Sequence, residues 1–203
     1  MLWRFVVVKK VRIGTLSVFK PVNQCLDLMP FIVLCFRVYR DPLFFLLRAD
    51  FNRVRLVLAA LELWQNGLSK CSACTYPQHH AVISKAAGNA YLLLVESSET
   101  GKAELGKDGM PSVRECVEKG TSLHRSSLEY FTPTDDPMQY ATTKLNMAIL
   151  YLKQDSEREF VEAAISCVAD PFVVESLKDS PYQQSLQGVA VLAKQAACKV
   201  GIL

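Results

Sequence analysis

The sequence predicts an all-α fold in which helical hairpins stack side by side into an α-α superhelix, preceded by a short basic and apolar extension. Three observations lead to this prediction. Half of the 203 residues are hydrophobic and 21% are charged, so the chain can bury a substantial core. Apolar and small residues recur at helical spacing through residues 51–203. Proline-headed segments in this region also resemble one another at a regular interval.

The extension is predicted to span residues 1–50. Basic residues greatly outnumber acidic ones from Met1 to Leu56, whereas the whole chain carries a net charge of only +3. The apolar stretch 29–47 is long enough to cross a bilayer, but Arg37, Arg40 and Asp41 lie in its middle and oppose insertion. We therefore expect no transmembrane segment. The β-branched and aromatic composition favours strands, and the fold of the extension stays open. It could pack on the rest of the chain.

The remaining residues, 51–203, are predicted to form one helical repeat domain. The small residues that follow Pro77 match those that follow Pro137, so we call the interval between these two prolines the repeat interval. A weaker third copy begins at Ser180-Pro181, a shorter distance along the chain from Pro137. A polar loop with three glycines is predicted over residues 96–111, and its length accounts for the difference between the two intervals.

The predicted helices follow from this periodicity and from the residues at their starts. A proline is tolerated in the first turn because its missing amide has no helical partner there. Asp136 and Ser180 are good N-cap residues, whereas Tyr76 is not. Apolar or small residues then recur every three or four positions. The helices are expected over residues 53–70, 77–95, 112–130, 137–153, 156–169, 172–178 and 182–199.

Four short patterns carry a resemblance to a known family. They are Ala81-x6-Gly88-Asn89-Ala90-Tyr91, Ala141-x3-Leu145-x2-Ala148-x2-Tyr151, Ala60-x3-Trp64-x2-Gly67 and Phe160-x3-Ala164-x2-Cys167 followed by Pro171. The first two resemble the first helix of the unit, with a small residue three positions before a tyrosine, and the last two resemble its second helix. In Ala60-x3-Trp64-x2-Gly67 a small residue, an aromatic and a second small residue would let two helices approach closely. The chain resembles the tetratricopeptide (TPR) repeat over about residues 53–199. It departs from that family at Ser84 and Lys144, which replace the tryptophan of the motif, and its units are longer than the usual TPR unit.

The resemblance implies a non-enzymatic scaffold or adaptor that binds a peptide or a helix of a partner protein. Stacked hairpins of this kind present their first helices along an extended groove. The predicted partner-binding residues are the polar ones on that face, and Lys85 and Lys144 would supply positive charge to a bound carboxylate. The full set is Gln78, His79, Lys85, Asn89, Gln139, Thr143, Lys144 and Asn146. The alternative interpretation is that these residues simply form a hydrated surface.

Catalytic and metal-binding alternatives find little support. Cys71-x2-Cys74 followed by His79 and His80 is half of a zinc motif, but no second C-x2-C pair exists. The histidine and serines of His124-Arg125-Ser126-Ser127 are adjacent and would not face one another on a helix. The glycines between residues 101 and 109 lack the spacing of a phosphate-binding loop. We expect no enzyme activity, no cofactor, no metal and no small-molecule substrate.

The compartment is predicted from the cysteines and the start of the chain. Seven scattered cysteines without a secretory signal indicate reduced thiols and a cytoplasmic protein, with the nucleus also possible. A different class of function would use the basic extension, which could contact an anionic membrane surface or RNA. The chain could also be a subunit of a larger assembly, since three repeats are near the minimum for a stable stack.

Overall fold

The computed structural model describes residues 50–101, 104–107 and 110–202, and everything it describes as regular structure is helical. The predicted all-α fold is confirmed for these residues. The extension predicted over residues 1–50 lies outside them, apart from Asp50. The helices are α3 (Asp50–Lys70), α4 (Pro77–Glu99), α5 (Val113–Leu128), α6 (Pro137–Leu152), α7 (Arg158–Val168), α8 (Pro171–Leu177) and α9 (Gln183–Lys199).

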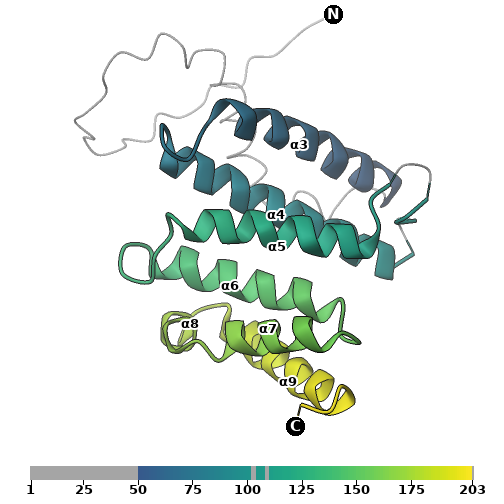
Figure 1. Cartoon of the computed structure of the whole chain (residues 1–203), viewed down its shortest axis with the longest axis vertical. Helices are drawn as coiled ribbons and strands as arrows, with labels where there is room; N and C mark the ends of the chain where they lie inside the picture. Colours follow the sequence, from purple (N-terminus) through teal and green to yellow (C-terminus); the bar gives the residue numbers. More distant parts are fainter. Residues whose placement is uncertain (1–49, 102–103, 108–109, 203) are drawn as a thin grey trace, which may run out of the picture.

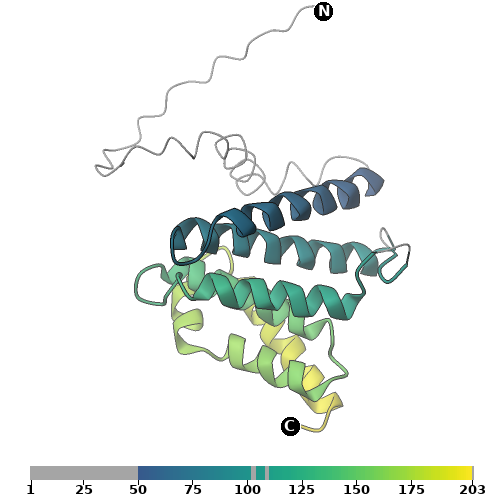
Figure 2. The ribbon, with the colours of Figure 1, turned by 45° about the horizontal axis from the view of Figure 1, so that its top comes forward.

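From α3 to α7, successive helices pack against one another in the order of the chain. Helices α3, α4, α5 and α6 lie roughly side by side, and α7, α8 and α9 complete the opposite end (Figure 1). Helices α4 and α5 share the most extensive contact, while α8 packs on α6 and α9 packs on α7. The turned view in Figure 2 shows the same succession of layers. None of the described helices is both long and apolar enough to cross a membrane.

The core has two main parts, which meet at α5. One contains buried residues of α3 and α4 together with Cys116, and the other contains residues of α6, α7, α8 and α9 together with Val117 of α5 and Leu92 of α4. Helix α5 therefore contributes adjacent residues to both parts. Because each layer contacts mainly its neighbours, the folded state depends on every layer having another beside it.

Two glycines allow α4 and α5 to approach closely. A Cβ atom added at Gly88 would lie 2.7 Å from the ring of His124. One added at Gly120 would lie 3.1 Å from the Cβ of Tyr91 and 2.9 Å from a methyl carbon of Leu150. Gly88 is one of the small residues in the patterns that the sequence predicts, and it lies at a close contact between helices.

The starts of α4 and α6 also match the sequence prediction. Pro77 and Pro137 each occupy the first turn of their helix. The side chain of Asp136 accepts a hydrogen bond from the backbone N–H of Gln139, whereas Tyr76 caps nothing with its side chain. A good N-cap is typically worth about 1 kcal/mol relative to alanine, so α6 has a local start signal that α4 lacks.

Two details differ from the prediction. Helix α4 continues to Glu99, into the loop predicted over 96–111. This extension is stabilised locally, because the buried hydroxyl of Ser97 donates to the carbonyl of Leu93 and Lys153 pairs with Glu99 at 2.6 Å. The helix ends where Gly101 adopts a φ of 71°, a conformation that glycine tolerates.

The third copy predicted at Ser180-Pro181 is the second difference. Pro181 does not stand at the first position of α9, because Tyr182 is the N-cap and the helix begins at Gln183. The hydroxyl of Ser180 instead donates to the carbonyl of Leu177 at the end of α8. When Pro181 is aligned with Pro137, the buried residues of α9 other than Val189 do not match those of α6. The burial pattern of α9 therefore does not repeat that of α6.

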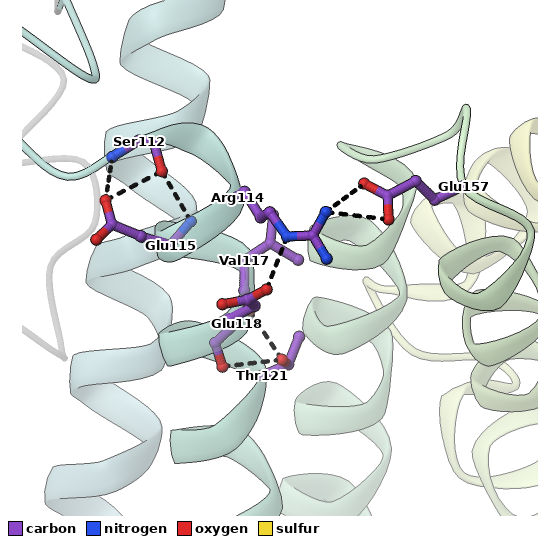
Figure 3. A network of polar contacts seen from close by, with 7 residues as sticks. All are labelled: Ser112, Arg114, Glu115, Val117, Glu118, Thr121 and Glu157. Carbon is purple, nitrogen blue, oxygen red and sulfur yellow. Dashed lines mark hydrogen bonds and ion pairs between the residues drawn. The ribbon is translucent and has the colours of Figure 1, made fainter.

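Helix α5 begins with a capping box and an exposed ionic network (Figure 3). The hydroxyl of Ser112 accepts from the backbone N–H of Glu115, whose carboxylate accepts from the backbone N–H of Ser112. This carboxylate also accepts from the hydroxyl of Ser112, and the two bonds that it accepts lower the pKa of Glu115. Arg114 contacts Glu118 on its own helix and Glu157 just before α7. The three side chains are largely exposed, so this network orients α5 and α7 more than it stabilises them.

Candidate functional site

The candidate site is the line of contact between α4 and α6, which we call the α4–α6 seam. It comprises Lys85 and Asn89 of α4 with Gln139, Thr142 and Asn146 of α6. The α4 residues are four positions apart, and the α6 residues are three and four positions apart. Each set therefore falls on one face of its helix. The seam continues to Glu99 and Lys153, which form an ion pair.

Lys85 lies at the centre of the seam and is 3% exposed. Its ammonium donates to the carbonyl oxygen of Gln139 at 3.2 Å, to the Oε1 of Gln139 at 2.6 Å and to the Oγ1 of Thr142 at 2.6 Å. These three bonds match the three N–H groups of an ammonium. The nitrogen also lies 5.9 Å from the centre of the Phe131 ring. Lys85 thus fastens α4 to α6.

The burial of Lys85 changes its acidity. Loss of hydration lowers its pKa from 10.5 to about 8, partly opposed by the carboxylate of Asp136. The side chain is therefore still mainly protonated at neutral pH. Its positive charge lies within the seam, and its N–H groups donate to Gln139 and Thr142 of α6.

Asn89 and Asn146 lie farther along the seam and contact each other. The Nδ2 of Asn146 donates to the Oδ1 of Asn89 at 2.8 Å, and both side chains are half-buried. A primary amide offers two N–H donors and an acceptor oxygen. The contact uses one donor of Asn146 and one lone pair of Asn89. The amide N–H groups of Asn89 and the amide oxygen of Asn146 are not used in it. Such a pair can match the alternating N–H and C=O groups of a peptide backbone.

The remaining predicted residues are placed elsewhere. Gln78 and His79 are exposed at the start of α4, and the His79 ring stands edge-on to Tyr76. Thr143 is buried and donates to the carbonyl of Gln139 within its own helix. Lys144 faces α8, with its nitrogen 3.8 Å from the Oδ2 of Asp170 and 5.6 Å from the centre of the Tyr140 ring.

Thr143 was predicted from the sequence as a site residue, whereas in the structure Thr142 lies on the seam. Counting along α6 from Gln139 to Asn146 would have placed Thr142 on their common face, but Thr143 is also within one turn of Gln139. The contact between Tyr140 and Asp170 was also not predicted from the sequence. The hydroxyl of Tyr140 donates to the Oδ2 of Asp170 at 2.7 Å, and burial together with this carboxylate raises the pKa of Tyr140 to about 12. No sequence signal linked them, because they lie far apart in the chain, on different helices.

The cysteine and histidine motif does not converge in the structure. Cys71 is buried, Cys74 and His79 are exposed, and His80 is half-buried at the start of α4. Within residues 50–101, 104–107 and 110–202, no group of three or more histidine, cysteine, aspartate or glutamate side chains could hold a metal ion.

A second buried polar group lies between α4 and α5. His124 is fully buried, and neither of its ring nitrogens has a hydrogen-bond partner. The hydroxyl of Ser84, on α4, is likewise buried without a partner. Burial lowers the pKa of His124 to about 3, with a smaller contribution from the charge of Lys85. The imidazole is therefore neutral, and it is closed off from any substrate.

Comparison with protein-family models, with curated proteins and with solved structures found no match to this chain.

Proposed function

We propose that this chain is a non-enzymatic, TPR-like scaffold or adaptor, and that the α4–α6 seam binds a peptide or helix of a partner protein. The observation that carries the proposal is the half-buried pair of Asn89 and Asn146, which aligns amide groups between two neighbouring helices. Amide side chains on such a face suit the backbone of a bound peptide segment.

The repeat character of the proposal is supported by burial that recurs at the repeat interval. Every buried residue of α6 has a buried counterpart in α4. The buried residues in and directly after α3 have buried counterparts in and after α5 in the same way. These pairs are Val57 and Val117, Leu61 and Thr121, Trp64 and His124, Gly67 and Ser127, and Cys71 and Phe131.

The turns that join these helices give independent support. Before α4, the backbone N–H of Thr75 donates to the hydroxyl of Ser72 at 3.2 Å. Before α6, the backbone N–H of Asp135 donates to the hydroxyl of Thr132 at 3.1 Å. The two turns are separated by the same repeat interval, and the residue that follows each closes on the carbonyl of the same hydroxyl residue. Two units of like construction, packed side by side, are consistent with a repeat protein.

The chemistry of the seam favours recognition of a peptide backbone over that of a free carboxylate. The N–H groups of Lys85 are engaged with α6, and Lys144 lies near the carboxylate of Asp170. A partner's carboxylate would have to displace these contacts.

We propose a cytoplasmic or nuclear location, because the described cysteines are free thiols, as in a reducing compartment.

Selection of random peptides displayed on phage, with the full-length chain as bait, tests this function. Peptides enriched by the wild-type chain should bind the Asn146→Ala variant at least about tenfold more weakly, a difference of about 1.4 kcal/mol. The Asn66→Ala variant is the matched control, since Asn66 is an exposed asparagine on α3, away from the seam. Circular dichroism should show both variants folded. Equal binding by all three proteins would contradict the proposal.

A further inference from the structure

The outer face of α3 carries an aliphatic surface that the described residues cover only in part. Leu56 is 55% exposed and Leu63 is 38% exposed, and they lie seven positions apart on one side of the helix. Ala60, half-buried, lies between them. We call these three residues the α3 stripe. Val57 and Leu61 lie about 100° around the helix from the stripe and are buried against α4.

The equivalent residues of α5 show what such a stripe does. One repeat interval after the α3 stripe, α5 carries Cys116, Gly120 and Leu123. Cys116 is fully buried in the part of the core formed with α3 and α4, and Leu123 packs against the same part. Gly120 lies between Tyr91 of α4 and Leu150 of α6. Cys116 and Leu123 therefore pack toward the helices that precede α5 in the chain. By contrast, Val117 joins the part of the core formed with α6, which follows α5.

The correspondence therefore assigns a direction to each side of α3. Val57 and Leu61 pack against the helix that follows α3, as Val117, the counterpart of Val57, joins the part of the core formed with α6. The α3 stripe corresponds to the side of α5 that packs against the preceding segment of chain. Its exposed leucines are placed to receive an apolar segment that lies before α3 in the sequence.

We propose that residues 29–47 of this chain are that segment and pack on the α3 stripe. This stretch has three charged residues in nineteen and is the most apolar part of the sequence before α3. It ends three positions before α3 begins. A segment tethered this closely has an effective concentration of the order of millimolar, an advantage that a second molecule lacks. Burial of the two leucines would contribute free energy from both surfaces.

A cysteine crosslinking experiment on the full-length chain tests this inference. The variant carries Leu63→Cys with Cys74→Ser and Cys198→Ser, and a short bis-maleimide is added to a mixture of 14N- and 15N-labelled protein. Mass spectrometry of the digest is expected to show position 63 linked to the native Cys35 within one isotope. A link between the two isotopes would place a second copy on the stripe and overturn the inference. Absence of any link to Cys35 would overturn it as well.

A stability comparison provides a second, independent measurement. Leu56→Asp in the full-length chain should lower the Tm by several degrees, because it places a carboxylate in a covered contact. Leu192→Asp is the matched control, since Leu192 is equally exposed at 55%, on α9. Its Tm should stay within one or two degrees of that of the wild type, as is usual for exposed positions. Equal Tm values for the two variants would contradict a covered stripe.

Discussion

At the scale of single residues, the surroundings of His124 strongly disfavour its protonation. This histidine occupies the position that Trp64 takes one repeat interval earlier, and both side chains are buried at a helix contact. An indole is mostly apolar, but an imidazole has two nitrogens that normally need partners. In this structure neither nitrogen has one. The fold therefore holds this histidine neutral, and its protonation must compete with the packing of α4 on α5.

The pH dependence of stability follows from this contrast. The pKa of His124 is about 3 in the folded chain and about 6.5 when unfolded, so below pH 6.5 the unfolded state binds more protons. Its stabilising effect is complete above about pH 6.5 and is lost as the pH falls toward 3. Lowering the pH from about 7 to about 5 should cost about 2 kcal/mol through this group alone.

Urea unfolding at the two pH values, compared between wild type and His124→Phe, measures that contribution. The phenylalanine ring has a similar shape and no titrating nitrogen. The variant should therefore lose about 2 kcal/mol less stability between pH 7 and pH 5 than the wild type does. An equal loss in both proteins would show that His124 is not the acid-sensitive group.

At the scale of elements, the contact between α4 and α5 depends on the absence of a side chain at Gly88. The His124 ring stands over this glycine, so a methyl group there would push the helices apart or force the ring to move. Alanine is otherwise the better helix former, by about 0.8–1.0 kcal/mol. At position 88, close packing against His124 therefore favours glycine, although alanine has the higher helix propensity.

The substitution Gly88→Ala should destabilise the chain by about 1–3 kcal/mol, the usual cost of overpacking a core. Gly188→Ala on α9 is the matched control, because nothing lies within 4 Å of the added Cβ. That variant should gain up to about 1 kcal/mol from helix propensity. Urea unfolding of the two variants gives both values. If Gly88→Ala were as stable as Gly188→Ala, the close approach of α4 and α5 would not be required.

The sequence predicted these helices better than it predicted the seam. Helical spacing and the prolines at residues 77 and 137 placed all seven described helices to within a few residues. Site residues were harder, because helical periodicity gives a face only to within about one turn. It could not separate Thr142 from Thr143, nor show that Lys85 points inward and bonds to α6. Those features depend on which helix lies beside α4, a long-range contact that no local pattern specifies.

At the scale of the whole molecule, the two-part core sets how the chain should lose structure. Leu94 is fully buried in the part formed with α3 and α4, and Leu177 is fully buried in the part formed by α6 to α9. Few residues are shared between the parts, and α5 joins them. In stacked helical arrays, stability is approximately a sum of local and nearest-neighbour contributions. A cavity at one end should therefore weaken that end before it affects the other.

Amide hydrogen exchange followed by mass spectrometry, on Leu94→Ala and Leu177→Ala, tests this expectation. Each substitution should cost about 2–5 kcal/mol where it lies. Leu177→Ala should accelerate exchange in α8 and α9 while the amides of α3 and α4 stay nearly as protected as in the wild type. Leu94→Ala should produce the reverse pattern, because α3 and α4 lose their shared contact. If either variant raised exchange equally in all helices, the chain would unfold as one cooperative unit, and the stacked description of its energetics would be wrong.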